Sequence, residues 1–89
     1  MKKQIIHLDP KDNVAAVVEA MSRGTVVRLP DGQSITALDD IPRSHKIALA
    51  DIPAGGMVYR YGEEIGYATK DIRRGEWVHT HNIDSVNMM

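Results

Sequence analysis

Two short segments of this 89-residue sequence contain the residue types that could do chemistry. The first is His79-Thr80-His81-Asn82, which follows the apolar pair Trp77-Val78. Side chains two residues apart on an extended strand point to the same face, about 6.6–7 Å apart along the chain. The two imidazoles could therefore act together, as metal ligands or as acid–base groups on one substrate. The alternative is a pair of solvent-exposed strand histidines.

A metal centre would need more ligands than this segment supplies. A catalytic divalent metal is usually held by three protein ligands, with one open position. No acidic residue stands at a supporting spacing, Asp84 being only a weak candidate, and the sequence contains no cysteine. If His79 and His81 bind a metal, another chain must complete the site.

The second segment, His45-Lys46, pairs a titratable ring with a cation. Together the two side chains could hold a carboxylate, with Lys46 as a point charge and His45 as a hydrogen-bond donor. The alternative is that His45 bonds a turn carbonyl while Lys46 is solvated. The sequence has no phosphate-binding loop, nucleophile elbow or HExxH motif, so we do not expect an enzyme that works alone.

The composition limits the class of protein. A length of 89 residues, 43% of them hydrophobic, fits one globular domain over 1–89 with a thin core, so association with a partner or with further copies is expected. Lys plus Arg total 11 against 12 for Asp plus Glu, which disfavours nucleic acid as a partner. No apolar run is long enough to span a membrane, and no signal peptide is recognised, so we expect a cytoplasmic protein.

The segments that position these residues are expected to be mainly β, after one short helix. Residues 4–8 read as an opening strand, and Asp9-Pro10 could cap and start a helix. Apolar residues then recur at helical spacing from Val14 to Met21, and Gly24 could end the helix. Residues 25–29 and 34–38 are expected to form a hairpin around Pro30-Asp31-Gly32.

A degenerate repeat organises the remainder. Three units start with Asp40-Ile41, Asp51-Ile52 and Asp71-Ile72, and a weaker one starts at Met21. We expect each unit to bury its isoleucine, to turn through Ser44, Gly55 or Gly75, and to launch a strand at Ile47, Val58 or Val78. The aspartates are expected to bond amides of their own turns. Between the last two units, residues 58–68 predict a hairpin with Glu63 and Glu64 as solvated turn residues.

Four segments in order resemble the SAF-type domain of the altronate and galactarate dehydratase family, which includes sulfolactate sulfo-lyase with its separate small subunit. The segments are Asp12-Asn13-Val14-Ala15, His45 to Ile52, Tyr61 to Ala68, and His79 to Asn82. The resemblance covers the chain from about Ile5 to Asn82 and implies a β-clip fold. It also implies a free-standing small subunit, or an N-terminal domain, of an enzyme whose large chain is absent here.

The resemblance implies a hydro-lyase reaction, the β-elimination of water from a small sugar acid, assisted by a divalent metal with Fe²⁺ as the family expectation. On this basis His79 and His81 would be catalytic or metal-binding residues at a site shared with the large subunit, and His45 and Lys46 would bind the substrate carboxylate. The sequence has Ser44 where the family pattern has glycine before His-Lys. Either the turn differs, or this residue does not need left-handed backbone.

Alternatives from other classes remain at this stage. The chain could be a non-catalytic lid or assembly module, or the small subunit of a sulfolactate sulfo-lyase. A carbohydrate-binding module is disfavoured by the few aromatic residues, although Trp77 stands beside the histidine pair. The ending His-x-His-Asn resembles the altronate and sulfolactate branches more than the galactarate branch.

Overall fold

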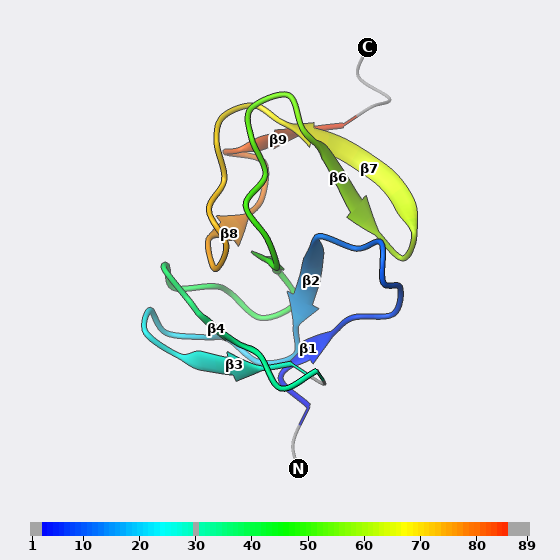
Figure 1. Cartoon of the computed structure of the whole chain (residues 1–89). Helices are drawn as coiled ribbons and strands as arrows, with labels where there is room; N and C mark the ends of the chain where they lie inside the picture. Colours follow the sequence, from blue (N-terminus) through cyan, green and yellow to red (C-terminus); the bar gives the residue numbers. More distant parts are fainter. Residues whose placement is uncertain (1–2, 30, 86–89) are drawn as a thin grey trace.

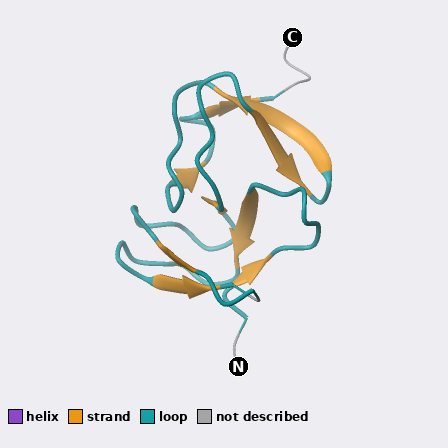
Figure 2. Ribbon diagram, viewed as in Figure 1, coloured by secondary structure: helices purple, strands orange, loops and turns teal. Residues whose placement is uncertain are grey.

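The computed structural model describes residues 3–29 and 31–85. These ranges contain nine β-strands and no helix (Figures 1 and 2). The strands are β1 (Ile5–Ile6), β2 (Val14–Val17), β3 (Val26–Arg28), β4 (Ser34–Thr36), β5 (Lys46–Ala48), β6 (Met57–Arg60), β7 (Glu63–Ala68), β8 (Trp77–Val78) and β9 (Ile83–Asp84). The mainly β fold expected from the sequence is therefore confirmed. No helix in these ranges is long and apolar enough to cross a membrane.

A central antiparallel sheet, in the order β1-β2-β5-β8, lies between two smaller sheets. The hairpin β3-β4 lies at one end of the molecule and the three-stranded sheet β6-β7-β9 at the other, as Figure 1 shows. Alternate residues of the central strands enter two different cores. Ala15 and Ile47 belong to the core on the β3-β4 side, and Val14 and Ala48 to the core on the β6-β7 side.

The predicted helix from Val14 to Met21 is wrong. Residues Val14–Val17 form β2, and all four are buried. A strand buried on both faces has apolar residues at consecutive positions, so its period cannot be distinguished from that of a buried helix over so short a run. Asp9 does not cap a helix, because its Oδ1 accepts the Lys11 N–H at 2.9 Å in a local turn.

Both predicted hairpins are present. Residues of β3 pair with β4, and Gly32 in the connection has φ +89°; Pro30, which we expected in this turn, lies outside the described residues. Strands β6 and β7 pair around Tyr61 and Gly62, both with positive φ. Glu63 and Glu64 are exposed as predicted, but they begin β7 and are not part of the turn.

The repeat units have the local structure that the sequence predicts. Ile41, Ile52 and Ile72 are at most 2% exposed. Ser44, Gly55 and Gly75 all have positive φ, so Ser44 does use left-handed backbone, at +69°. The apolar residues Ile47, Val58 and Val78 lie in β5, β6 and β8 and are fully buried.

The aspartates of the repeats bond across to a neighbouring unit, and the prediction that they bond their own turns is wrong. The units pack in pairs through isolated bridges, Met21 with Ile41 and Ile52 with Ile72. Asp51 Oδ1 accepts the Arg74 N–H at 2.8 Å, and Asp71 Oδ1 accepts the Ala54 N–H at 2.9 Å. Asp40 Oδ1 accepts the Arg23 N–H at 2.8 Å in the other pair. Pairing places the amides of one turn beside the carboxylate of the other, which only the tertiary structure determines.

Candidate functional site

The antiparallel pairing of β5 with β8 brings the two predicted segments together. Lys46 is the register partner of Val78, so His45 lies beside the residues that follow β8. The rings of His45 and His79 have centroids 4.3 Å apart. His45, His79 and His81 all contact Trp77, and with Lys46 we call these residues the histidine cluster.

Trp77 organises the cluster. Its ring stacks with His79 at an interplanar angle of 8° and a centroid distance of 5.9 Å. The ring of His81 lies 4.8 Å from that of Trp77, and its side chain is exposed. The other side of this arrangement is apolar, because Trp77 packs against the core that contains Ile47. Each histidine is thus held near a rigid ring with one part open to solvent.

A hydrogen bond determines which nitrogen of His45 is available. The Trp77 indole N–H donates to His45 Nδ1 at 3.1 Å. A nitrogen that accepts cannot carry the proton in a neutral imidazole, so Nε2 carries it. His45 therefore presents an N–H donor, which suits a carboxylate and does not suit a metal ion. The substrate-binding role expected for His45 stays a prediction.

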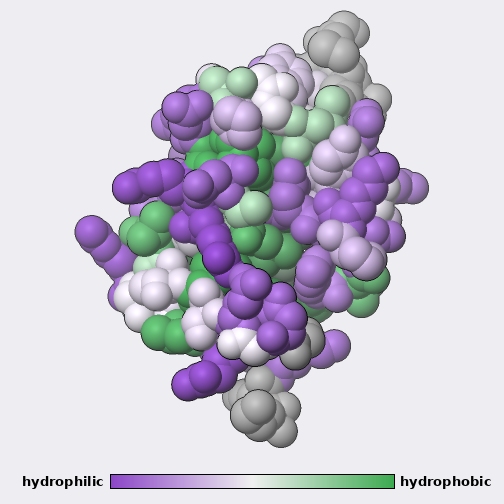
Figure 3. Space-filling model, in the orientation of Figure 1, coloured by the Kyte–Doolittle hydropathy of each residue, from purple (hydrophilic) through white to green (hydrophobic). Residues whose placement is uncertain are grey.

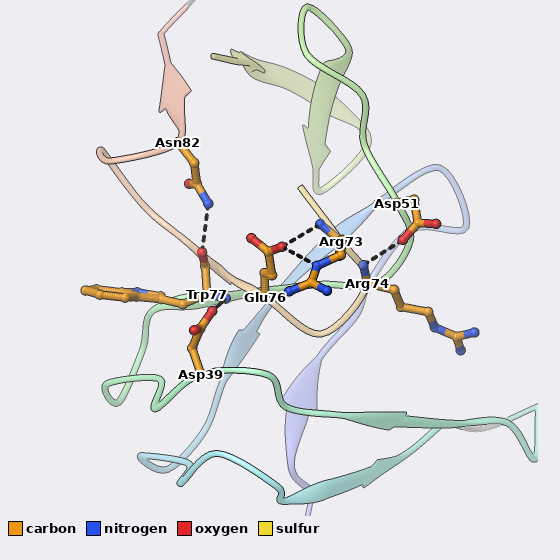
Figure 4. A network of polar contacts seen from close by, with 7 residues as sticks. All are labelled: Asp39, Asp51, Arg73, Arg74, Glu76, Trp77 and Asn82. Atoms are coloured by element: carbon orange, nitrogen blue, oxygen red, sulfur yellow. Dashed lines mark hydrogen bonds and ion pairs between the residues drawn. The ribbon is translucent and has the colours of Figure 1, made fainter. Parts of the chain in front are cut away.

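His79 and His81 lie in a turn and not on a strand as we expected. The His79 carbonyl accepts the N–H groups of Asn82 and Ile83, both at 3.1 Å, between β8 and β9. Asn82 is fully buried, and its Oδ1 accepts the His79 N–H at 3.0 Å. Its amide group donates to the Trp77 carbonyl at 2.9 Å, as Figure 4 shows. Asn82 therefore closes the turn that orients both histidines.

Asp39 is a second supporting residue that sequence reasoning missed. Its Oδ2 accepts the Trp77 N–H at 3.1 Å, from a segment 38 positions away (Figure 4). No local pattern distinguishes it from the aspartates of the repeats. For Asn82 a signal exists, since a polar amide directly after His-x-His could have been assigned to closing a turn.

Basic side chains lie close together in the cluster. Partial burial, together with the neighbouring His45, Lys46 and His81, lowers the pKa of His79. Burial, and then the positive charge of Arg60, lowers the pKa of Lys46. His79 is therefore more readily neutral than an isolated histidine, and the surface around it favours an anion.

A metal would need ligands from elsewhere. In the described ranges, no group of three or more His, Cys, Asp or Glu side chains is arranged to hold a metal ion. With His45 acting as a donor, His79 and His81 are the two residues of the histidine cluster that offer imidazole lone pairs, and a catalytic site normally takes three protein ligands. The donor set of this chain is thus incomplete, and another chain would have to supply the remaining ligands.

The polar pair Asp12-Asn13, from another of the four segments of the resemblance, attaches one sheet to another. Asn13 accepts the Tyr59 N–H at 2.8 Å and donates to the Met57 carbonyl at 2.9 Å. Asp12 Oδ1 accepts the Gly62 N–H at 2.7 Å. These bonds attach the β6-β7 hairpin to the start of β2, so they support the fold around the site.

A hollow of about 640 Å³ lies elsewhere on the molecule. It is lined by polar residues that include His7, Asp12, Asp51 and Arg74, and by the apolar Leu49, but by none of the four predicted site residues. Figure 3 shows one face of the molecule, where hydrophilic residues form a band with hydrophobic surface exposed between them.

Comparison with known proteins identifies the family. Residues 3–86 match the altronate/galactarate dehydratase SAF domain. The chain is 45% identical over 73 residues to galactarate dehydratase (L-threo-forming) of Escherichia coli (strain K12), and 44% identical over 79 residues to altronate dehydratase of the same organism. These matches cover 82% and 89% of this chain.

The relatives differ in how much of their length is matched. The chain spans only 14% of that galactarate dehydratase and 16% of that altronate dehydratase. It also matches (2R)-sulfolactate sulfo-lyase subunit alpha of Paracoccus pantotrophus, at 48% identity over 48 residues, or 54% of this chain and 72% of the relative. The matched region is thus a small part of a long chain in two relatives and most of a subunit in the third. The protein belongs to the altronate/galactarate dehydratase SAF-domain family.

Proposed function

We propose that this chain is the small subunit, or the N-terminal domain, of a sugar-acid dehydratase, and that it contributes substrate-facing residues to an active site completed by a large chain. The observation that carries the proposal is the convergence of His45, His79 and His81 on Trp77 beside Lys46, in a member of this family. The proposal includes the cytoplasmic location expected from the sequence.

The proposed reaction is elimination of water from a polyhydroxy acid. A base takes the proton from the carbon next to the carboxylate, and the hydroxyl on the neighbouring carbon leaves as water after receiving a proton. The lowered pKa of His79 suits it to accept a proton near neutral pH. His81 is exposed beside it and can donate, while the His45 Nε2–H and Lys46 hold the carboxylate.

The proposal keeps a divalent metal, with Fe²⁺ as the family expectation, as a group shared with the large chain. His79 and His81 would supply two of its ligands, and the metal would stabilise the negative charge that develops next to the carboxylate. A neutral imidazole can serve as a base or as a ligand. Metal content measured on variants separates these two roles.

The test is to purify the chain together with a large dehydratase chain of this family and to assay turnover of altronate, galactarate and sulfolactate. His79→Ala and His81→Ala are expected to lower kcat by about 100-fold or more, as expected for loss of an acid–base group. His7→Ala is the matched control, because His7 is an exposed histidine outside the cluster. If a variant with lowered kcat has also lost the metal, the replaced histidine is a metal ligand. If such a variant retains the metal, the replaced histidine is an acid–base group. Unchanged turnover with unchanged metal content would overturn the site assignment.

A sulfo-lyase small subunit is the second candidate. It is favoured by the match over 72% of the alpha subunit of the Paracoccus pantotrophus enzyme. Release of sulfite from sulfolactate, without turnover of either sugar acid, would select it. A carbohydrate-binding module has less support, because one Trp77 face stacks on His79 and the ring also contacts His81. A non-catalytic lid remains the alternative if single histidine variants have no effect on kcat.

A further inference from the structure

Arg60 is a charged residue that the assigned site does not use. Its Nε is buried and has no hydrogen-bond partner in the described part of the chain, and the same holds for the Nε of Arg74, which lines the separate hollow. The Arg60 Nη2 donates to the Tyr61 hydroxyl at 2.8 Å, and the Arg60 guanidinium carbon lies 4.5 Å from the Tyr61 ring centre. A buried donor without an acceptor is costly, which indicates that an acceptor is missing from the site.

The fold directs Arg60 toward the central sheet. Val58 points into the core that the β6-β7 sheet shares with the central sheet. Arg60 lies two residues further along β6, and so on the same face. The register shift in this hairpin leaves the alternation of β6 intact, because the extra residue, Ile65, lies on β7.

Lys46 points from the central sheet into the region between that sheet and the β6-β7 sheet, which Arg60 enters from β6. It pairs with Ala16 on β2 and Val78 on β8, and Val78 is part of that same core. Register partners in antiparallel strands share a face, so Lys46 points toward the β6-β7 sheet. The hydrogen bond from the Tyr59 N–H to Asn13 Oδ1 holds the end of β6 close to the start of β2. The depressed pKa of Lys46, to which the charge of Arg60 contributes, agrees with this closeness.

Neither cation forms an ion pair with a carboxylate of residues 3–29 and 31–85. The ion pair in these ranges is between Arg73 and Glu76. Glu63 is the register partner of Arg60, yet it is exposed and forms no ion pair with it in these ranges. Two half-buried cations that repel each other are destabilising unless an anion binds between them.

We propose that Lys46 and Arg60 form a two-cation site for the carboxylate of a small hydroxy acid, between the central sheet and the β6-β7 hairpin and next to the three histidines of the cluster. Arg60 would offer its Nε–H to one carboxylate oxygen, and Lys46 would pair with the other, so that Arg60 joins Lys46 and the His45 Nε2–H in holding the carboxylate. The proposal deepens the proposed function, since it adds Arg60 as a substrate-binding residue. The site binds carboxylate by itself, so its test does not need turnover.

The experiment is an NMR titration of the full 89-residue chain with galactarate, and with galactitol as the uncharged analogue. The Arg60 Nε–H resonance is expected to shift downfield with galactarate and to stay in place with galactitol. Arg60→Gln and Lys46→Gln should each weaken galactarate binding by about tenfold or more, the loss expected for a charge-assisted hydrogen bond. Arg73→Gln is the matched control, because Arg73 is an exposed arginine paired with Glu76. Circular dichroism checks that each variant is folded.

Three outcomes would overturn the proposal. One is an Arg60 Nε–H resonance that does not respond to galactarate, and another is equal weakening by the Arg73→Gln control. The third is a shift of the Arg60 Nε–H resonance when the large chain is added without sugar acid, if galactarate does not reverse this shift. The acceptor of the Arg60 Nε–H would then be a carboxylate of the large chain at a protein interface. Failure of the proposed function can be distinguished from failure of this site. If the chain binds galactarate through Arg60 but supports no turnover, the carboxylate site is retained and the proposed reaction is rejected.

Discussion

The two pairs of repeat turns differ in regularity. In the pair formed by the units at Asp51 and Asp71, both turns use glycine, at φ +83° and +95°, and each aspartate caps the other turn. In the pair formed by the units at Met21 and Asp40, only Asp40 provides such a cap, and Ala20 stands where the reciprocal aspartate would be. The second turn of this pair passes through Ser44, at φ +69°.

Both pairs lead into the site. Ser44 of the irregular pair is followed directly by His45 and Lys46, whereas Gly75 of the regular pair leads into β8, with Trp77, and then His79. Backbone strain like that at Ser44 is common beside functional residues. The comparison indicates that a strained serine turn precedes the residues expected to bind substrate, whereas a glycine turn without that strain precedes Trp77 and the histidines after it. Three predictions test this contrast.

The largest expected effect is on the regular pair. Gly75→Ala should destabilise the fold by about 2–4 kcal/mol, because left-handed backbone disfavours a side chain and because overpacking adds to that cost. A Cβ at this position would clash with the backbone oxygen of Thr36. Gly55→Ala is the control, since its φ is also positive but the space around it is open, and about 1 kcal/mol is expected there. Urea unfolding measures both, and equal losses would show that the close contact with Thr36 has no effect.

The next effect concerns the missing cap. Ala20→Asp should stabilise the irregular pair by up to about 1 kcal/mol, because the new carboxylate would accept the Arg43 N–H as Asp40 accepts the Arg23 N–H. Ala20→Glu is the control, with the same charge and a longer side chain. The urea midpoint reports the change. A gain shared by both variants would point to a general charge effect and would contradict the symmetry between the two pairs.

The smallest effect is the pH dependence of the site. The pKa of His79 is lower in the folded protein, so the unfolded chain binds a proton first as the pH falls through the ordinary histidine value of 6.5. Stability should therefore fall with acidification through this value. The neighbours responsible are His45, Lys46 and His81, besides partial burial.

The measurement for this prediction is the difference in unfolding free energy between the wild type and His79→Gln, on either side of the histidine value. The wild type should lose more stability than the variant at the acidic value. Parallel pH profiles for the two proteins would mean that His79 is not perturbed by its neighbours.

Some features could be predicted because they depend on neighbours in the sequence. The positive φ of Gly55 and Gly75 follows from residue types that favour tight turns, and the burial of the following apolar residues follows from the alternation of strands. Residues His45, Lys46, His79 and His81 were recognised by type and spacing. The structure brings these residues together and places His79 and His81 in a turn closed by Asn82, while their roles stay predictions.

Other features could not be predicted, because long-range contacts decide them. Val14 to Val17 carry a pattern that fits a helix or a buried strand, and only the pairing with Ile5 and Lys46 selects the strand. Arg60 has no sequence motif, and it becomes a candidate only when β6 packs over the central sheet.

The sequence by itself determined the mainly β composition, the repeated turns and the residues whose side chains could do chemistry. Turns and strand alternation are local properties of the chain. Only the tertiary structure decided how these residues act together. The Trp77 indole reaches a histidine 32 positions away, and this contact selects the donor nitrogen of His45. Asp51 and Asp71 cap each other's turns over 23 and 17 positions. Such contacts arise from the packing of sheets, which residue spacing along the chain does not encode.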